Sequence, residues 1–403
     1  MILNDNLTVN NKVIQNRVVF QPMEGCDGTS DGNIGKLTER RYMRFAESGA
    51  GIIWFEATAV CKEGRANPRQ LYLMEENVDT YKILLDNIRK VSIENFGYAP
   101  LIILQATHSG RYSKPNGTPE PIIAYRNKVY EKGKENLLYH IITDEECDAL
   151  PQKFAHTALL AQKAGFDGVD IKCCHGYLLD EFLSAYNRSG KYGGSFENRT
   201  RLYYNCIDAV KNAVDEDMIV TTRLSAYDGF NYPYGFGSSE TKNIDLTETK
   251  KILSELKKRN IELVNITIGN PYLIPHINRP YINSPEDGEI GVQRVVKITE
   301  ELQKEFPKLR LILSALSYKG ETAVDFAETC LENGCCSLVG FGRMTFAYPS
   351  FYRDYIENGK LDKNKLCIKC GNCSKMMRAG GVAGCPVRDK ETYLPLFKKY
   401  MEK

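Results

Sequence analysis

Short runs of apolar residues recur along most of the chain, and each run is bounded by turn-forming residues. Their length and their content of β-branched residues are typical of strands. The runs are Val18–Pro22, Gly51–Ala57, Leu101–Gln105, Gly168–Lys172, Met218–Ser225, Leu263–Ile268, Leu309–Ser314 and Ser337–Phe341. The pattern therefore predicts eight short apolar strands.

Segments with helical periodicity separate these runs. The clearest are Thr38–Ser48, Asp144–Ala164, Asp245–Arg259 and Gly320–Asn333, with Thr38 and Asp245 as expected N-caps. Strand and helix alternate eight times, which predicts a parallel sheet closed into a (β/α)8 TIM barrel. An open, doubly wound sheet is the alternative, and the lack of a glycine-rich dinucleotide turn after the first strand disfavours it.

The barrel pattern stops after Ile356, and residues 361–403 are rich in Cys, Lys and Gly. A segment this short cannot build its own apolar core and usually needs a metal to fold. We therefore expect two parts, a barrel over residues 1–360 and a cysteine-rich, metal-binding extension over residues 361–403.

Length and composition narrow the class of protein. A chain of 403 residues can hold one barrel with insertions, and a net charge of +2 argues against nucleic-acid and membrane-surface partners. The polar start of the chain lacks a signal pattern, and the apolar runs are far shorter than the ~20 residues of a membrane span. Thirteen cysteines without such a signal indicate a reducing, cytoplasmic setting.

In a barrel of this kind the functional residues lie at the carboxyl ends of the strands. Two longer inserts, Thr107–Asn136 and Asn187–Asn198, are expected to cover that face. The residues that follow the predicted strands, and so become candidates, are Met23, Glu24, Gln105, Lys172, His175, Arg223, Ser314, Gly342 and Arg343.

Two motifs identify a family. Cys174–Ser184 reads CHGYLLDEFLS and Tyr192–Arg199 reads YGGSFENR, and supporting motifs run from Asn16 to Met23 and from Gly340 to Arg343. Together they resemble the old yellow enzyme family, which includes 2,4-dienoyl-CoA reductases and trimethylamine dehydrogenase. The resemblance extends over roughly residues 1–385 and implies an FMN-binding barrel.

The resemblance implies that FMN is bound by Pro22, Met23, Glu24, Gln105, Arg223, Ser314, Ser317, Gly342 and Arg343. The Gln105 amide can pair with the pyrimidine edge, and Arg223 provides positive charge near N1 and O2. The loops after strands seven and eight are expected to surround the phosphate with Ser314, Ser317, Gly342 and Arg343. The alternatives are a buried polar pair for Gln105 and Arg223, and a surface turn for Gly342-Arg343.

Family members activate an unsaturated carbonyl substrate with two donors three residues apart, which are Lys172 and His175 here. His175 fits the family pattern, whereas Lys172 departs from it. An ammonium group can still hold an oxyanion, and the change suits an acidic substrate; alternatively, Lys172 pairs with Asp170 or Glu24 and only shapes the pocket. Tyr177 matches the family's proton donor, with ordinary packing as its alternative role.

Glu24 is a second departure, because relatives carry a small Thr or Cys where the flavin O4 is expected. A carboxylate there disfavours an anionic reduced flavin unless Lys172 pairs with it. The two departures leave the identity of the substrate open.

Cys367, Cys370 and Cys373 form a C-x2-C-x2-C motif, and Cys385-Pro386 follows after eleven intervening residues. This spacing suits a [4Fe–4S] cluster, and the related dienoyl-CoA reductase and trimethylamine dehydrogenase branch carries one at this place. Zinc bound by four thiolates is the second interpretation, and a metal-free tail is the third.

The sequence thus predicts an FMN-dependent oxidoreductase. Its expected reaction is ene-reduction, the transfer of hydride to an activated C=C bond of an enoate, enone or enoyl thioester. The alternatives are an amine dehydrogenase or demethylase, and an electron carrier that depends on a partner protein. The electron source is expected to be NADH, NADPH or a separate donor protein, and a homo-oligomer is the expected assembly.

Overall fold

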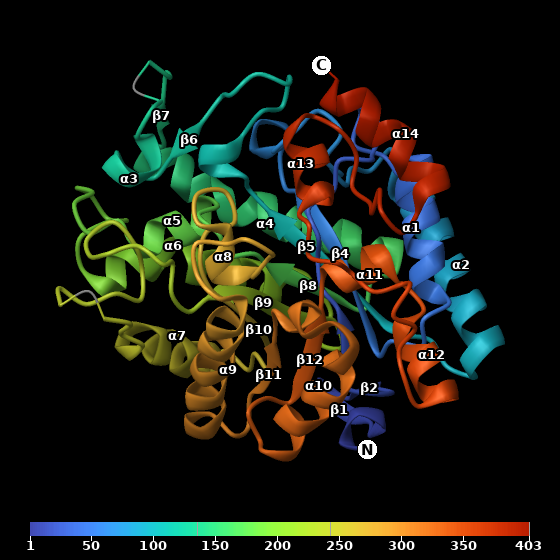
Figure 1. Ribbon diagram of the computed structural model, residues 1–403. Helices are drawn as coiled ribbons and strands as arrows, with labels where there is room; N and C mark the ends of the chain where they lie inside the picture. The colour runs from blue at the N-terminus through green and yellow to red at the C-terminus, as the bar shows by residue number, and fades with distance from the viewer. Residues whose placement is uncertain (135, 242, 403) are drawn as a thin grey trace.

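A computed structural model describes residues 1–134, 136–241 and 243–402, and its centre is a closed parallel barrel (Figure 1). The order of strands around the barrel is β3-β4-β5-β8-β9-β10-β11-β12, closing back onto β3. The barrel strands are β3 (Val18–Phe20), β4 (Ile52–Ala59), β5 (Leu101–Thr107), β8 (Gly168–Ile171), β9 (Ile219–Ser225), β10 (Leu263–Thr267), β11 (Arg310–Leu313) and β12 (Leu338–Phe341).

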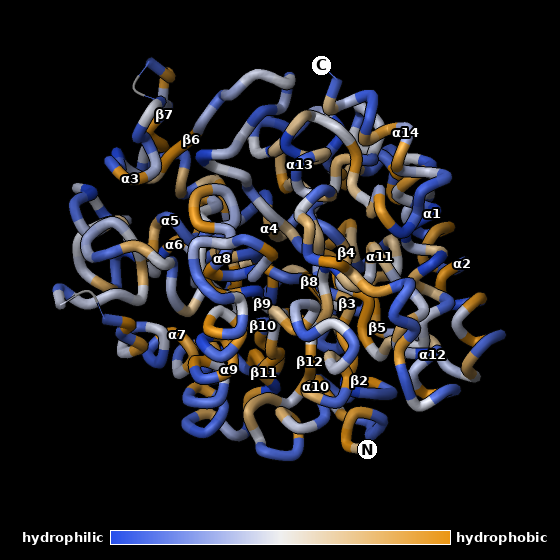
Figure 2. Tube along the Cα trace, in the orientation of Figure 1, coloured by the Kyte–Doolittle hydropathy of each residue, from blue (hydrophilic) through white to orange (hydrophobic). Residues whose placement is uncertain are grey.

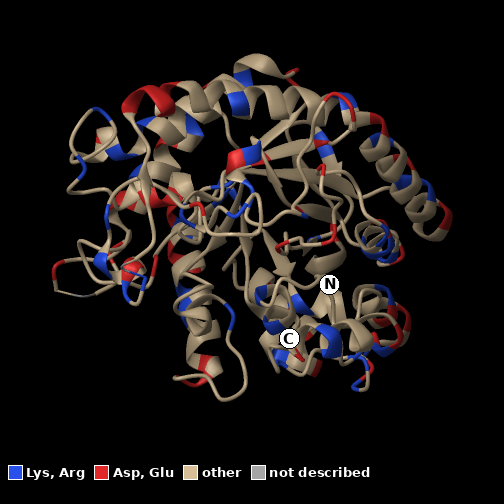
Figure 3. Cartoon of the chain, turned by 90° about the horizontal axis from the view of Figure 1, so that it is seen from above, with Lys and Arg blue, Asp and Glu red and all other residues tan. Residues whose placement is uncertain are grey.

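Each barrel strand overlaps one of the eight apolar runs, so the predicted barrel is confirmed and the open sheet is wrong. Every residue of β4, β5, β9 and β10 is buried, since helices cover the outside and side chains fill the interior. The hydropathy trace shows the apolar residues concentrated along these central strands (Figure 2), while most charged residues lie on the outer helices and loops (Figure 3).

The helices that surround the barrel largely follow the predicted pattern. The longest, α4, spans Asp144–Ala164 as predicted, with a capping box at Thr143 and a left-handed Gly165 after its end. The first helix begins at Lys36 after Gly35, so Thr38 is not its N-cap. The other outer helices are α1 (Lys36–Ala46), α2 (Val78–Phe96), α6 (Phe196–Ala213), α7 (Thr247–Lys258), α9 (Gly288–Glu305), α10 (Ala323–Glu332) and α12 (Phe351–Asn358).

Shorter elements close the two ends of the barrel. The hairpin β1 (Leu7–Val9) and β2 (Lys12–Ile14) lies at the bottom of Figure 1. The described part of the expected insert Thr107–Asn136, which excludes residue 135, lies at the opposite end. The remaining short elements are β6 (Ile122–Ile123), β7 (His140–Ile141), α3 (Lys128–Glu131), α5 (Leu178–Leu183), α8 (Pro275–Asn278) and α11 (Arg343–Ala347). No helix in the described ranges is long and apolar enough to cross a membrane.

The cysteine-rich segment folds against the barrel, where α13 (Asn372–Arg378) and α14 (Lys390–Met401) lie beside α1 (Figure 1). Met376, Val382 and Tyr393 form a small apolar cluster that also includes Leu37 of α1. The segment therefore shares its core with the first helix, as expected for a segment too short to build its own.

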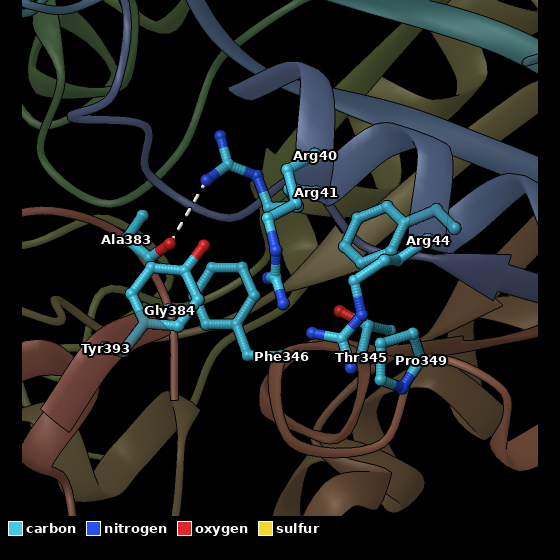
Figure 4. A pocket seen from close by; sticks show the side chains of 10 residues that line it. Arg40, Arg41, Arg44, Thr345, Phe346, Pro349, Ala383, Gly384 and Tyr393 are labelled. Carbon is cyan, nitrogen blue, oxygen red and sulfur yellow. Dashed lines mark hydrogen bonds between the residues drawn. The ribbon is translucent and has the colours of Figure 1, made fainter. Parts of the chain in front are cut away.

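Arginines of α1 hold this segment in place (Figure 4). Arg40 and Arg44 pair with Asp389 at 2.7 and 2.5 Å, and Arg41 donates to the carbonyl oxygen of Ala383 at 3.2 Å. Arg41 is itself buried between the carboxylates of Asp27 and Glu56. Asp27 follows β3, and Glu56 lies in β4. The tail is thus joined to the barrel through charged groups that are largely withdrawn from water.

We predict that Asp389→Asn weakens the attachment of the tail. The Asp389 side chain is 8% exposed and pairs with two guanidinium groups, so its loss leaves two arginines without a carboxylate. Because Arg40 and Arg44 are about a third exposed, we expect a modest loss of about 1 kcal/mol. Limited proteolysis should cleave the tail faster, while the exposed Glu391→Gln on the same helix should behave as wild type. Equal cleavage rates in both variants would contradict this role of Asp389.

Candidate active site

A cavity of about 890 Å³, including its opening to solvent, lies at the carboxyl ends of the barrel strands. Every residue predicted to bind the flavin or to act on substrate lines it. Its lining residues are Gln21, Pro22, Met23, Glu24, Ala57, Gln105, Lys172, His175, Tyr177, Pro271, Arg223, Asn278, Arg279, Ser314, Ala315, Ser317, Gly342, Arg343 and Met377. The structure thus brings the predicted residues together, whereas their roles remain predictions.

Asp170 is the buried anchor of one wall. Its carboxylate accepts hydrogen bonds from Trp54 Nε1 at 2.9 Å, from Gln105 Nε2 at 2.7 Å and from the backbone N–H of Arg223 at 2.7 Å. Burial raises the pKa of Asp170 to about 6, and these donors oppose that rise. Because the carboxylate takes an N–H of Gln105, the amide keeps its carbonyl oxygen and its second N–H for a ligand.

Arg223 brings an uncompensated positive charge into the cavity. Its Nη1 donates to the carbonyl oxygen of Pro22 at 3.1 Å, and its buried Nε has no hydrogen-bond partner. Burial lowers the pKa of the guanidinium, although it stays far above neutral pH because Arg does not deprotonate in proteins. A buried donor of this kind fits a ligand acceptor such as flavin O2.

The loops after β11 and β12 form the opposite wall. Ser314 accepts a hydrogen bond from Gln21 Nε2 at 3.1 Å and donates to the carbonyl oxygen of Ile266 at 3.0 Å. Ser317 accepts from the backbone N–H of Met344 at 3.1 Å, and Arg343 donates to the carbonyl oxygen of Pro280 at 2.6 Å. Arg343 is buried and forms no ion pair with a described carboxylate, so its charge is available for a phosphate.

A sharp turn after β8 carries His175 and Tyr177 into the cavity. His175 and Gly176 have φ angles of 65° and 73°, and a Cβ on Gly176 would lie 2.6 Å from Asn270 Nδ2. Glycine is thus required there both by conformation and by space. His175 Nε2 lies 3.0 Å from Thr267 Oγ1, and burial together with Arg223 and Lys172 holds its pKa well below the usual value. The imidazole is therefore neutral.

Lys172 does not form the ion pair that was one of its two predicted roles. Neither Glu24 nor Asp170, both described residues, lies within 4.0 Å of its ammonium nitrogen. Instead Nζ lies 3.4 Å from the centre of the Tyr177 ring, a cation–π contact. Burial lowers the pKa of Lys172, and the neighbouring Cys174 and Glu24 side chains act in the opposite direction.

Tyr177 is the first member of a hydrogen-bonded chain. Its hydroxyl lies 2.7 Å from the hydroxyl of Tyr272, which in turn donates to the Glu24 carboxylate, 2.9 Å from each oxygen. Burial, followed by the charge of Glu24, raises the pKa of both phenols well above the usual value. Both groups consequently keep their protons at neutral pH.

Sequence reasoning missed the loop that follows β10. It supplies Tyr272, Asn278 and Arg279, and Arg279 donates to the carbonyl oxygen of Pro271 at 3.1 Å and to Ser374 of the tail. Burial, with Arg343 and Arg378 nearby, lowers the pKa of Arg279 to about 10. The position of this loop in the sequence could have identified it. It follows the sixth predicted strand and therefore lies on the same face of the barrel as the other candidate residues.

The lining residues carry four cationic side chains, those of Lys172, Arg223, Arg279 and Arg343, against one carboxylate, Glu24. Isolated buried charge of one sign is costly unless a ligand balances it. FMN carries negative charge at its phosphate and, when reduced, also at N1 and O2 of the ring. These separated negative charges would balance the positive charge of the lining. The donor set therefore fits the predicted cofactor.

The four tail cysteines remain a separate feature. All thirteen cysteines are free thiols, and Cys367, Cys373 and Cys385 pack against the main core. Burial raises the pKa of Cys385 to about 11, with small contributions from Cys373 and Cys367. In residues 1–134, 136–241 and 243–402, no group of three or more His, Cys, Asp or Glu is arranged to hold a metal. The [4Fe–4S] cluster and its zinc alternative thus stay predictions.

Comparison with known proteins supports the interpretation of this cavity. The model of the NADH:flavin oxidoreductase / NADH oxidase family matches residues 3–362. An NADPH dehydrogenase of Clostridium acetobutylicum is 28% identical over 85% of this chain and 91% of its own length. An NADPH dehydrogenase of Halalkalibacterium halodurans is 32% identical over 64% of this chain and 70% of its own length.

Solved structures share the fold. A 2-naphthoyl-CoA reductase superimposes with a TM-score of 0.79 at 19% identity, covering 99% of this chain and 58% of that longer one. An old yellow enzyme homologue from Zymomonas mobilis gives a TM-score of 0.68 at 22% identity, covering 90% of this chain and 95% of its own. Histamine dehydrogenase from Rhizobium sp. 4-9 gives a TM-score of 0.73 at 18% identity, covering 96% of this chain and 53% of its own.

At these identities the superpositions establish a common fold and no more, whereas the family model matches nearly the whole barrel together with the strand ends that form the cavity. The chain belongs to the NADH:flavin oxidoreductase / NADH oxidase family of flavin-dependent oxidoreductases.

Proposed function

We propose that this protein is an FMN-dependent ene-reductase, which reduces a C=C bond conjugated to a carbonyl or carboxylate group. One observation carries the proposal: Tyr177, a neutral phenol, shares a cavity with Lys172 and His175, two donors able to hold an oxyanion, and with the flavin-binding set. That combination of a proton donor and an oxyanion site is what reduction of an activated double bond requires.

Bound FMN would supply hydride to the carbon β to the activating group. In our proposal Gln105 and Arg223 hold the pyrimidine edge, with Pro22, Met23 and Glu24 beside it. Ser314, Ser317, Gly342 and Arg343 hold the phosphate. Lys172 and His175 bind the oxygen on which negative charge develops, and Tyr177 protonates the α carbon.

The charge of the cavity favours an anionic or carbonyl substrate over an amine. Arg223 and Arg343 are assigned to the flavin, which leaves Lys172 and Arg279 against the single carboxylate of Glu24, so a protonated amine would still meet net positive charge. Amine oxidation by the same fold is accordingly the second candidate, and a non-catalytic electron carrier is the third. A small unsaturated molecule is the proposed substrate and a homo-oligomer the proposed assembly.

We propose NADH or NADPH as the electron donor, in keeping with relatives that are NADPH dehydrogenases. An anaerobic absorption titration with each nucleotide tests this directly. Bleaching of the visible flavin band followed by its return on addition of an enone, enoate or enoyl thioester is the expected result. A flavin that stays oxidised would point to a separate protein donor, and one that no unsaturated acceptor reoxidises would contradict ene-reduction.

Tyr177→Phe should slow the reoxidation of the flavin by substrate about 100-fold or more, because the substrate loses its proton donor. Reduction of the flavin by NADPH should keep its wild-type rate, since no proton from Tyr177 is needed there. Stopped-flow absorption measures both half-reactions on one sample. Equal damage to both would indicate that Tyr177 only supports the packing of the site.

Arg223→Ala should weaken FMN binding about 10- to 100-fold, because a buried charged donor beside the flavin is lost. It should also lower the reduction potential, since positive charge near N1 stabilises the reduced ring. Arg223→Lys keeps the charge and should retain more of both properties. Unchanged flavin content and potential in Arg223→Ala would remove this residue from the cofactor site.

We further propose that residues 361–403 form a separate extension to the barrel of residues 1–360, and that Cys367, Cys370, Cys373 and Cys385 hold a [4Fe–4S] cluster. The C-x2-C-x2-C spacing and the distal Cys-Pro support this proposal. Such a cluster would pass single electrons.

Cys370→Ala should remove most of the bound iron while the flavin stays, because one of four proposed ligands is lost. Iron, sulfide and flavin assays of anaerobically purified protein measure this. Cys335→Ala, which removes a buried thiol of the barrel, should leave the iron content at the wild-type level. Full iron content in Cys370→Ala would assign the metal elsewhere, and zinc in place of iron would favour the structural alternative.

A further inference from the structure

Tyr177 is almost fully buried, which raises the question of how it regains a proton after each turnover. Its side chain is 2% exposed, and Lys172 covers the ring, with Nζ 3.4 Å from the ring centre. Its hydroxyl hydrogen bonds to Tyr272 at 2.7 Å. The phenol therefore exchanges protons most directly with another side chain.

Tyr272 is held firmly in position to receive and pass on a proton. Its ring stacks on that of Tyr112 at 3.8 Å, and its backbone N–H donates to Asn270 Oδ1 at 2.9 Å. The same Asn270 donates through Nδ2 to the hydroxyl of Tyr112 at 2.8 Å. These contacts fix the Tyr272 hydroxyl between Tyr177 and the carboxylate of Glu24, with both carboxylate oxygens at 2.9 Å.

The direction of this chain of hydrogen bonds has a chemical consequence. When Glu24 is ionised it accepts from Tyr272, and Tyr272 then accepts from Tyr177, so the Tyr177 proton points away from the cavity. When Glu24 is protonated it donates to Tyr272, Tyr272 donates to Tyr177, and the Tyr177 proton is free to point at a substrate. The protonation of Glu24 thus decides whether Tyr177 is oriented to act as a donor.

We propose that Glu24 and Tyr272 form a proton relay that orients Tyr177 and resupplies the proton it gives to the substrate. This inference rests on the proposed ene-reductase function and assigns roles to a residue that departs from the family pattern and to one in the loop after β10. Glu24 and Tyr272 are positioning and proton-supplying residues, while Tyr177 alone contacts the reacting carbon.

The proton transfers balance. As the α carbon gains its C–H bond, the Tyr177 O–H bond breaks; Tyr272 returns a proton to Tyr177, and Glu24 returns one to Tyr272. Glu24 is left as a carboxylate and regains its proton from water. Bound reduced FMN would supply the electron pair and the other hydrogen of the reduction as hydride and would itself be oxidised.

Neighbouring charges suit a carboxyl group that alternates between two states. The cations of Lys172 and Arg279 lie within electrostatic reach of Glu24. The buried thiol of Cys26 and the phenols of Tyr177 and Tyr272 also face it, and these groups stay neutral because burial raises their pKa values.

The test measures the single-turnover rate at which an unsaturated acceptor reoxidises the reduced flavin in the flavin-loaded protein. The acceptor is whichever enone, enoate or enoyl thioester reacts fastest, and the rate is measured in mixtures of H2O and D2O. In the wild type we expect a solvent isotope effect that varies with the deuterium fraction along a curve, because more than one proton moves in the step. Tyr272→Phe and Glu24→Gln should each slow this step about 10-fold or more, and Tyr272→Phe should turn the curve into a straight line.

Tyr112→Phe is the matched control, because it removes a hydroxyl from the stacked neighbour that lies outside the chain of Glu24, Tyr272 and Tyr177. It should keep the curved dependence. Tyr272→Phe and Tyr112→Phe should retain flavin and the wild-type rate of reduction by NADPH, which separates a relay from a loss of structure. Glu24→Gln is compared in the reoxidation step alone, because Glu24 also lies beside the proposed flavin.

The outcomes distinguish the two proposals. If the wild type turns over an unsaturated acceptor, and Tyr272→Phe shows the wild-type rate and the same curved isotope dependence, the relay is overturned and the ene-reductase function stands. Failure of every acceptor to reoxidise the wild-type flavin would overturn the proposed function and the relay with it.

Discussion

The arrangement of the cavity depends on one buried carboxylate. Asp170 on β8 accepts hydrogen bonds from Trp54 on β4, from Gln105 on β5 and from the backbone of Arg223 on β9, so it joins four neighbouring strands of the barrel. A carboxylate withdrawn from water is tolerated only when donors satisfy it. Its need for partners fixes both the direction of the Gln105 amide and the position of the Arg223 backbone.

With that wall fixed, the cavity is left with unbalanced positive charge. Four cationic side chains face one carboxylate, and the Nε of Arg223 is buried without a partner. Such an arrangement is costly for the protein alone and becomes favourable when an anion binds, which is the usual situation in a preorganised cofactor site. Membership in a flavin-dependent family gives that anion a natural identity.

The proton-handling side of the cavity is built by three segments far apart in the sequence. The left-handed turn at His175 and Gly176 presents Tyr177, while the loop after β10 presents Tyr272, and Glu24 follows β3. Arg279 of the same loop also binds Ser374 in the tail, which places the cysteine-rich segment directly against the cavity wall. Met377 of the tail lines the cavity itself, so changes in the tail can reach the site directly as well as through Arg279.

The eight apolar runs and their helical spacers were enough to predict the barrel, and the motifs around His175 and Tyr192 were enough to indicate the family. Both are local signals: burial on each face of a strand dictates composition, and a tight turn dictates glycine. They also led to every predicted cavity residue, because strand ends of a barrel converge on one face.

Long-range pairing was beyond the sequence. Nothing local predicts that Tyr272 would lie between Tyr177 and Glu24, or that Lys172 would contact the Tyr177 ring instead of a carboxylate. The attachment of the tail to Arg40, Arg41 and Arg44 of α1 is equally non-local. The sequence by itself determined the fold and most of the residues at the cavity. Only the tertiary structure added the loop after β10 and decided which cavity residues bond to one another, because those partners are chosen by distance in space and by the need to satisfy buried charge.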